Sequence, residues 1–203
     1  MLERFRNVYT AIVKVPGEWL LRHHVTPNAV TATGTILLIV AALATVPWGF
    51  LWLGGILIPA LALTDGIDGY IARRTRPTRF GAFLDSTLDR LADGALLLAV
   101  ATWFARSAAP WWWITVTVFT LIVGQVIPYA RARAESLDLN GKGGLTGRAD
   151  RIALIAIGCF LEGVGVPYAL IVAMAVMAVL GCVTVGQRMT RAYRSPLACE
   201  EPG

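Results

Sequence analysis

Five aspartates lie within a short stretch of the chain: Asp65, Asp68, Asp85, Asp89 and Asp93. All of them fall in apolar segments, where an ionised carboxylate is costly and is therefore read first as a functional group. Helical spacings of i,i+3 and i,i+4 place Asp65 with Asp68, and Asp85 with Asp89, on one helix face each. Carboxylates in this arrangement suit divalent metal ions that act on phosphate groups.

The helices that carry these acids are expected over residues 50–73 and 82–105, with a short loop at 74–80 between them. A loop of this length makes the two helices antiparallel neighbours. With a rise of about 1.5 Å per residue, Asp65 and Asp89 both lie about 12 Å from the loop. The two helices therefore bring acidic side chains to the same level.

Asp68 and Asp85 lie nearer the loop, at about 7 and 6 Å from it by the same rise. Because like charges repel, four converging carboxylates need compensating cations, and two dications would balance them. Oxygen ligands without nearby Cys or His favour Mg²⁺, with Mn²⁺ or Ca²⁺ as alternatives. We expect the metal ligands to be Asp65, Asp68, Asp85 and Asp89.

The same aspartates could instead be helix-packing residues tied to arginines. That alternative would suffice for one aspartate, but it gives no reason for four acids to share a depth. Asp93 extends the Asp89 face by a further turn, and we expect it to have a buried hydrogen-bonding role. The arginines that could serve as packing partners are Arg73, Arg74, Arg76 and Arg90.

The composition places these helices in a membrane. The chain of 203 residues is 56% hydrophobic and 15% charged, and its mean hydropathy is +0.63. Lipid offers no partners for backbone polar groups, so each span of about 20 apolar residues must be helical. We expect one all-α integral membrane domain over 1–203 with a six-helix core at 29–188. The six transmembrane helices are expected at 29–46, 50–73, 82–105, 110–134, 149–163 and 166–188.

The basic residues predict the orientation of these spans. Lys and Arg are concentrated before the first span, after the sixth and in alternate loops, and such residues are retained in the cytoplasm. We therefore expect a multi-pass protein of the cell membrane with both termini and the acidic cluster on the cytoplasmic side. Residues 2–24 mix apolar and basic positions and predict an amphipathic juxtamembrane helix. The net charge of +5 reflects this topology and anionic lipid, with no nucleic-acid partner expected.

Two acidic segments resemble the signature of the CDP-alcohol phosphotransferases. Residues 65–73 read DGIDGYIAR and residues 81–89 read GAFLDSTLD, which match the family patterns DxxDGxxAR and GxxxDxxxD, with a linker one residue shorter than usual. Residues 26–31, TPNAVT, resemble the family's opening of the first span. Within the family, residues 125–135 and 143–151 look most like bacterial phosphatidylinositol phosphate synthases.

This resemblance implies a membrane enzyme of phospholipid biosynthesis, usually a homodimer. Such enzymes transfer the phosphatidyl group of CDP-diacylglycerol to an alcohol and release CMP. Asp65, Asp68 and Asp85 would be metal ligands, and Asp89 would lie beside the metals and act as the general base. The residues implied in binding CDP-diacylglycerol are Asn28, Thr31, Asp68, Gly69, Ala72, Arg73 and Gly81.

An acceptor that carries a phosphate is expected from arginines near the ends of the fourth and fifth spans, since guanidinium binds phosphate well. The resemblance favours inositol phosphate, which would give phosphatidylinositol phosphate. Glycerol 3-phosphate, the acceptor of phosphatidylglycerol phosphate synthases, fits the same cluster, and each arginine could also be only a topology charge. The expected acceptor residues are Arg131, Arg133, Arg148 and Arg151.

A cation transporter is the rival from another class, because transporters also use intramembrane aspartates. Such a protein needs polar groups that continue toward the external side. The outer halves of the expected spans are nearly uncharged, which favours an enzyme.

Overall fold

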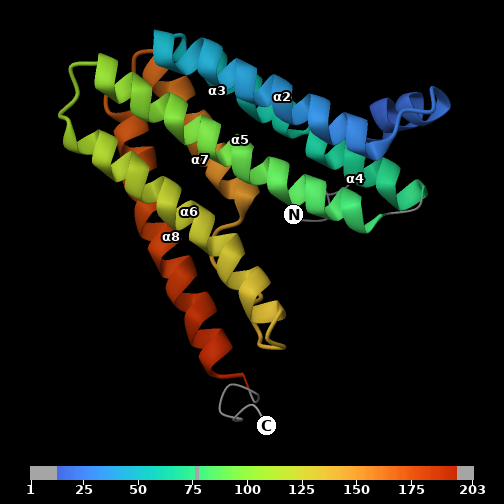
Figure 1. The fold of residues 1–203 in the computed structure, drawn as a ribbon. Coiled ribbons are helices and arrows are strands. Elements are labelled where there is room, and N and C mark those ends of the chain that lie inside the picture. The colour runs from blue at the N-terminus through green and yellow to red at the C-terminus, as the bar shows by residue number, and fades with distance from the viewer. Residues whose placement is uncertain (1–12, 76–77, 196–203) are drawn as a thin grey trace, which may run out of the picture.

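The computed structural model describes residues 13–75 and 78–195. Within these residues the fold is entirely helical, as expected, and contains no strand. Figure 1 shows the arrangement of the helices. Their bounds are α2 (Pro27–Thr45), the short 3₁₀ helix η1 (Val46–Trp48), α3 (Leu51–Ala62), α4 (Thr64–Arg74), α5 (Arg79–Arg106), α6 (Trp112–Glu135), α7 (Arg148–Gly163) and α8 (Ala169–Tyr193).

Four helical segments are long and apolar enough to cross a membrane: Pro27–Trp48, Leu51–Arg74, Trp112–Glu135 and Ala169–Tyr193. The other two helices expected as spans differ from these in composition or length. α5 has 28 residues, which is long enough, but its N-terminal half contains several charged residues. α7 has only 16 residues. Length and composition thus support a membrane protein with four of the six expected spans.

The span expected over residues 50–73 is present as the segment Leu51–Arg74, which is long and apolar enough to cross a membrane, and a one-residue break at Leu63 divides it into α3 and α4. Pro59 inside α3 has no N–H to donate, which removes one helical hydrogen bond. The Thr64 hydroxyl donates to the Leu61 carbonyl oxygen over 2.6 Å. The break precedes the acidic residues of α4, so their i,i+3 spacing on one helix is retained.

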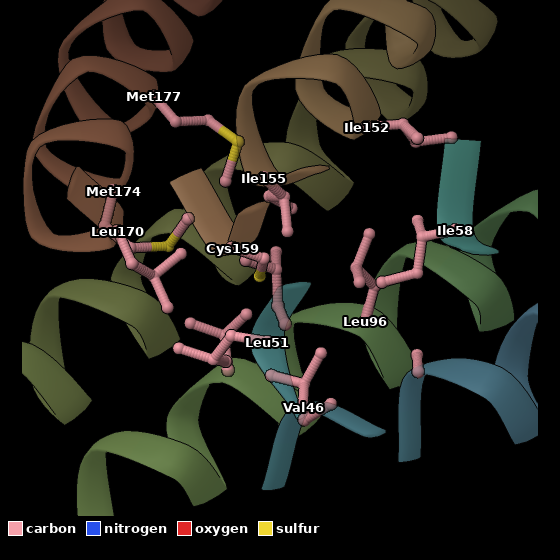
Figure 2. Close-up of a cluster of buried hydrophobic side chains, with 14 of the residues drawn as sticks. Val46, Leu51, Ile58, Leu96, Ile152, Ile155, Cys159, Leu170, Met174 and Met177 are labelled. Atoms are coloured by element: carbon pink, nitrogen blue, oxygen red, sulfur yellow. The ribbon is translucent and has the colours of Figure 1, made fainter. Parts of the chain in front are cut away.

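The helices pack in two groups that meet at α5 and at the contact between α3 and α7. α2 packs against α3, α4 and α5, while α6 lies against α5 and α8, and α7 lies against α3 and α8. In the view of Figure 1, α6 and α8 diverge from the α2 and α5 pair. Buried side chains of α3, α5, α7 and α8, among them Ile58, Leu96, Ile155 and Met177, form the core seen in Figure 2. This core fixes the level of α5, and so of its aspartates, relative to α7.

The described part of the predicted amphipathic segment lies against α4. Residues 13–22 are helical, and the Tyr70 hydroxyl of α4 donates to Glu18 Oε1 over 3.2 Å. Residues 1–12, which make up the first half of the segment predicted at 2–24, lie outside the described residues.

Candidate active site

A pocket of about 360 Å³ opens between the N-terminal end of α2, the middle of α4 and the N-terminal end of α5. Every residue expected to bind CDP-diacylglycerol lines this pocket except Arg73. The lining residues are Thr26, Pro27, Asn28, Thr31, Asp68, Gly69, Ala72, Thr78, Gly81, Ala82 and Asp85. Three helices therefore bring the resemblance-derived donor residues to one place.

Capping residues fix the two helix ends at this pocket. Thr26 Oγ1 accepts from the Ala29 N–H at the start of α2, and Thr78 Oγ1 accepts from the Gly81 N–H at the start of α5 over 3.0 Å. Both helix N-termini thus face the pocket, and their partial positive charge favours a phosphate group there. Sequence reasoning did not assign Thr26 and Thr78, although threonine just before an apolar helix is an N-cap signal.

Two glycines line the pocket. A Cβ at Gly81 would lie 2.9 Å from Asn28 Oδ1 and 3.0 Å from Thr78 Oγ1, so these side chains would have to shift to admit it. A Cβ at Gly69 would lie 3.6 Å from Arg73 Nη1. The Arg73 guanidinium therefore lies beside the pocket residue Gly69, although Arg73 does not line the pocket itself.

Asp68 points into this pocket from α4 and is only 7% exposed. Thr31 Oγ1 of α2 donates to Asp68 Oδ2 over 2.5 Å, which fixes one oxygen of the carboxylate. Asp85 of α5 lines the same pocket. The two shallower aspartates predicted from the sequence therefore face one space, from adjacent helices.

Arg148, the first residue of α7, lies between the two deeper aspartates. Its Nη1 is paired with Asp65 Oδ2 and lies 2.7 Å from Asp89 Oδ1. Asp89 Oδ2 is also 3.8 Å from Arg90 Nη2. The predicted convergence of α4 and α5 at this depth is thus present, and a guanidinium from a third helix joins the two acids.

The donor atoms of the four predicted metal ligands are all carboxylate oxygens, which suit a hard divalent cation. As the side chains are placed, however, no group of three or more Asp, Glu, His or Cys residues in the described part of the chain is close enough to hold a metal ion. Arg148 instead neutralises Asp65 and Asp89. The residues therefore fit such a cation in kind, and the cation would have to compete with Arg148.

The four arginines expected at the acceptor site divide into an exposed pair and a buried pair. Arg131 Nε donates to Glu135 Oε1 over 2.9 Å, and Arg133 Nη1 lies 3.5 Å from Ser136 Oγ; both are exposed at the end of α6. Arg148 lies among the aspartates, and Arg151 is buried beside Asp93. The structure therefore places only Arg148 in contact with the predicted catalytic carboxylate.

Two arginines of α8 hold the loop that precedes Arg148, and sequence reasoning had counted them only as topology charges. Arg188 Nε donates to the Gly143 carbonyl oxygen over 2.9 Å, and Arg191 Nη1 donates to the Lys142 carbonyl oxygen over 2.8 Å. Gly143 and Gly144 have φ values of 93° and 127°, a conformation that glycine adopts without strain. The Gly-Gly pair was the available signal for this anchored loop.

Comparisons with known proteins identify the relatives of this chain. The family model described as CDP-alcohol phosphatidyltransferase matches residues 24–186. The chain is 37% identical to the phosphatidylinositol phosphate synthase of Cutibacterium acnes, over 98% of this chain and 100% of that protein. It is 40% identical to the protein of the same name from Mycobacteroides abscessus, over 96% and 90% of the two chains.

Solved structures of the Mycobacterium tuberculosis phosphatidylinositol phosphate synthase have the same fold. The structure with CDP-DAG bound gives a TM-score of 0.87 at 34% identity and covers 97% of this chain and 99% of that chain. The complex with manganese and citrate gives a TM-score of 0.86 at 34% identity, over 96% and 93% of the two chains. On the match over most of its length, this chain belongs to the CDP-alcohol phosphatidyltransferase family.

Proposed function

We propose that this protein transfers the phosphatidyl group of CDP-diacylglycerol to a hydroxyl of inositol phosphate, giving phosphatidylinositol phosphate and CMP. The observation that carries the proposal is the pocket between α2, α4 and α5, whose lining includes the expected donor residues. The fold that forms this pocket matches a synthase of that name with CDP-DAG bound. The acceptor assignment follows the name shared by the relatives with more than a third of their residues identical.

For the donor, we assign the pocket to the cytidine diphosphate part of the substrate. Gly69, Ala72 and Gly81 leave room for a flat base against the helix backbones. The N-terminal ends of α2, with Asn28 and Thr31, and of α5 favour the phosphates. Arg73 beside Gly69 adds positive charge at the pocket edge, while the acyl chains stay in the bilayer.

For the chemistry, we assign Asp89 as the general base. Its carboxylate accepts the proton of the acceptor hydroxyl, and the resulting alkoxide attacks the phosphorus that bears diacylglycerol. A P–O bond to the acceptor forms while the P–O bond to the CMP phosphate breaks, so CMP leaves with the electron pair. A general base must reach the proton directly, and Asp89 lies at the convergence of α4, α5 and the first turn of α7.

A divalent metal is proposed as the cofactor, held by Asp65, Asp68, Asp85 and Asp89. The donor oxygens and the manganese complex of the M. tuberculosis enzyme support this assignment. Two Mg²⁺ ions would balance the four carboxylates, and bound metal would stabilise the negative charge on the departing phosphate. The chain's own contribution is to hold these carboxylates at one level, with Thr31 orienting Asp68.

For the acceptor phosphate, we assign the arginines at the ends of α6 and α7. Arg148 lies nearest the chemistry, because it touches Asp89. Arg131 and Arg133 are exposed at the end of α6 and can meet a soluble phosphorylated polyol. Arg151, the remaining member of the expected set, is buried and paired with Asp93.

In the membrane, we propose one domain over 1–203 with six spans, in which α5 and α7 complete the four more apolar ones. A charged helix such as α5 is tolerated where its acids face protein partners and not lipid. Basic residues at span ends support cytoplasmic termini, a cytoplasmic active site and an amphipathic segment over residues 2–24. The family resemblance also supports a homodimer.

The test is transfer by the purified protein from CDP-diacylglycerol to radiolabelled acceptors supplied one at a time. We expect inositol phosphate to give labelled lipid and CMP in a metal-dependent reaction. Labelled lipid from glycerol 3-phosphate alone would instead identify a phosphatidylglycerol phosphate synthase. No CMP release with either acceptor would contradict the proposal.

A further inference from the structure

A buried ion pair lies one helical turn beyond the proposed catalytic aspartate. Arg151 of α7 donates through Nη2 to Asp93 Oδ2 of α5, and the two residues are 6% and 7% exposed. Burying two charges carries a large desolvation cost, so a hydrophobic pair of similar size would often be as stable. Stability alone therefore does not account for an ion pair at this position.

The second oxygen of Asp93 faces the proposed acceptor arginine. Asp93 Oδ1 lies 3.5 Å from Arg148 Nε, and this nitrogen is buried without a hydrogen bond to any described residue. The other end of the same guanidinium contacts Asp65 and Asp89. Asp93 thus lies behind Arg148, on the side opposite the proposed reacting groups.

The spacing of the two aspartates along α5 and of the two arginines along α7 accounts for this arrangement. Asp89 and Asp93 are i,i+4 on α5, and Arg148 and Arg151 are i,i+3 on α7, so each pair occupies one helix face. α7 packs mainly against α3 and α8, where Gly158 allows the α8 backbone near Leu170 to approach closely. The long arginine side chains therefore span the distance from the first turns of α7 to α5.

Direct binding of the acceptor by Arg151 is excluded by the space around it. The cavity beside the ion pair has a volume of about 10 Å³, which is near the lower limit for one water molecule. It is lined by Asp93, Gly124, Gln125 and Arg151 together with apolar side chains. A phosphorylated polyol cannot enter this space, so Arg151 must act through Asp93.

We infer that Asp93 and Arg151 are positioning residues that hold the Arg148 guanidinium against Asp89, and thereby align the acceptor phosphate with the general base. This inference rests on the proposed function, in which Arg148 binds that phosphate. Arg151 fixes one oxygen of Asp93, and the other oxygen restrains Arg148 from behind. Small displacements of a positioning group are costly, because the acceptor hydroxyl must lie in line with the phosphorus.

The first experiment replaces Asp93 with Asn, and Arg151 with Gln, in the full-length protein. We expect each variant to raise the KM for inositol phosphate by about 10- to 100-fold, the range seen when a supporting group is lost from a site. The KM for CDP-diacylglycerol should change little, because neither Asp93 nor Arg151 lines the donor pocket. Equal effects on the two KM values would overturn the inference.

The double variant Asp93→Asn with Arg151→Gln separates positioning from stability. Asp93→Asn leaves the buried Arg151 charge without its partner, and Arg151→Gln leaves Asp93 with only the 3.5 Å contact to Arg148 Nε, whereas the double variant removes both charges and should recover much of the lost Tm. We expect its KM for inositol phosphate to stay raised. If that KM returns to the wild-type value together with the Tm, the ion pair is only structural and the inference fails.

A second series measures coupling to Arg148. In an Arg148→Gln background, Asp93→Asn should not raise the acceptor KM further, because the group that it positions is already absent. If the double variant raises the acceptor KM by the product of the two single effects, the two residues act independently. That result would overturn the inference while the proposed function stands. If Arg148→Gln alone leaves the acceptor KM unchanged, the acceptor site of the proposed function is itself wrong, and the inference fails with it.

Glu162→Ala provides the matched control. Glu162 lies at the other end of α7, where its Oε2 accepts from the Leu170 N–H over 3.1 Å. Its replacement should lower the Tm without changing the acceptor KM. A rise in that KM equal to the rise for Asp93→Asn would show that any loss of α7 stability has this effect, and would overturn the positioning role.

Discussion

The proposed donor and acceptor sides of the site are assembled in different ways. The donor pocket uses the ends of α2, α4 and α5, with small residues and a hydroxyl that orients Asp68. The acceptor side uses long arginines, of which two are exposed at the end of α6 and two are drawn toward the aspartates of α5. The donor side is lined by small and hydroxyl-bearing residues, whereas the acceptor side is held by ion pairs.

This difference predicts which amino-acid substitutions each side should tolerate. A pocket lined by small residues is sensitive to added volume, because neighbouring side chains must move to make room for it. An arrangement held by ion pairs is sensitive to lost charge, since an unpaired buried partner is costly. Substitutions can therefore separate the two sides by their effects on the two KM values.

The largest effect should come from the residue at which the two sides meet. We expect Asp89→Asn to lower turnover by about 10²- to 10⁴-fold, the contribution that a positioned general base commonly makes. CDP-diacylglycerol binding should persist, because Asp89 is not among the residues that line the donor pocket. Labelled-acceptor incorporation and binding of the donor lipid in detergent measure the two quantities separately.

Asp138→Asn is the control for that substitution. Asp138 lies in the loop after α6 with a φ of 57°, a conformation that Asn adopts readily. This variant should transfer at the wild-type rate. Near wild-type turnover by Asp89→Asn would remove the general base from the proposed mechanism.

The next effect concerns Arg148. We expect Arg148→Gln to raise the acceptor KM by about 10- to 100-fold, since hydrogen bonds to charged groups contribute about 1.5 to 3 kcal/mol. Removal of the guanidinium also removes the charge that competes for Asp65 and Asp89. Mn²⁺ should therefore bind about fivefold tighter, the equivalent of an ion pair of about 1 kcal/mol.

Arg133→Gln distinguishes these two consequences. Arg133 is exposed at the end of α6, where its guanidinium lies near Ser136. The ion pairs of the proposed metal ligands are with Arg90 and Arg148, and do not involve Arg133. Its loss should raise the acceptor KM and leave Mn²⁺ affinity unchanged, as measured by electron paramagnetic resonance of the free ion. A change in Mn²⁺ affinity of the same size in both variants would show a general charge effect instead.

The sequence predicted the donor side in more detail than the acceptor side, and helical geometry explains why. Spacings of i,i+3 and i,i+4 determine which side chains share a face, so the grouping of Asp65 with Asp68 and of Asp85 with Asp89 followed directly. Which face of α7 meets α5 depends on packing between residues far apart in the chain. The contact of Arg148 with Asp65, and the burial of Arg151, therefore could not be predicted.

Helix breaks and caps also could not be predicted from the periodicity of apolar residues. The division between α3 and α4 depends on Pro59 and on the Thr64 hydroxyl, which donates a hydrogen bond to the Leu61 carbonyl oxygen. Proline gave a signal for a break, but the apolar run continued past it. The roles of Thr26 and Thr78 as caps were visible in the sequence only as residue types at helix starts.

A smaller effect tests the shape of the donor pocket. In Gly81→Ala the new Cβ would lie 2.9 Å from Asn28 Oδ1, so α5 or Asn28 must shift. Overpacking of about 1 kcal/mol corresponds to a rise of about fivefold in the KM for CDP-diacylglycerol. The acceptor KM should be unchanged, and steady-state kinetics with each substrate varied in turn measures both.

Gly94→Ala is the matched control on the same helix. A Cβ at Gly94 would meet nothing within 4 Å, and alanine is favoured over glycine in a helix by about 1 kcal/mol. This variant should keep both KM values and gain thermal stability. A similar rise in the donor KM for both glycine variants would mean that the backbone of α5, and not the pocket, controls donor binding.

The smallest effect should come from the hydrogen bond between α2 and α4. Thr31→Val removes the hydroxyl that donates to Asp68 Oδ2, and a loss of about 1 kcal/mol lowers the Tm by about 2 to 4 °C for a chain of this size. Thr31→Ser keeps the donor and should recover most of the Tm and of any small rise in the donor KM. Thr45→Val, which removes a bond to the Ala41 carbonyl oxygen at the other end of α2, should leave that KM unchanged. Equal donor KM values for Thr31→Val and Thr31→Ser would show that the hydroxyl does not orient Asp68 for donor binding.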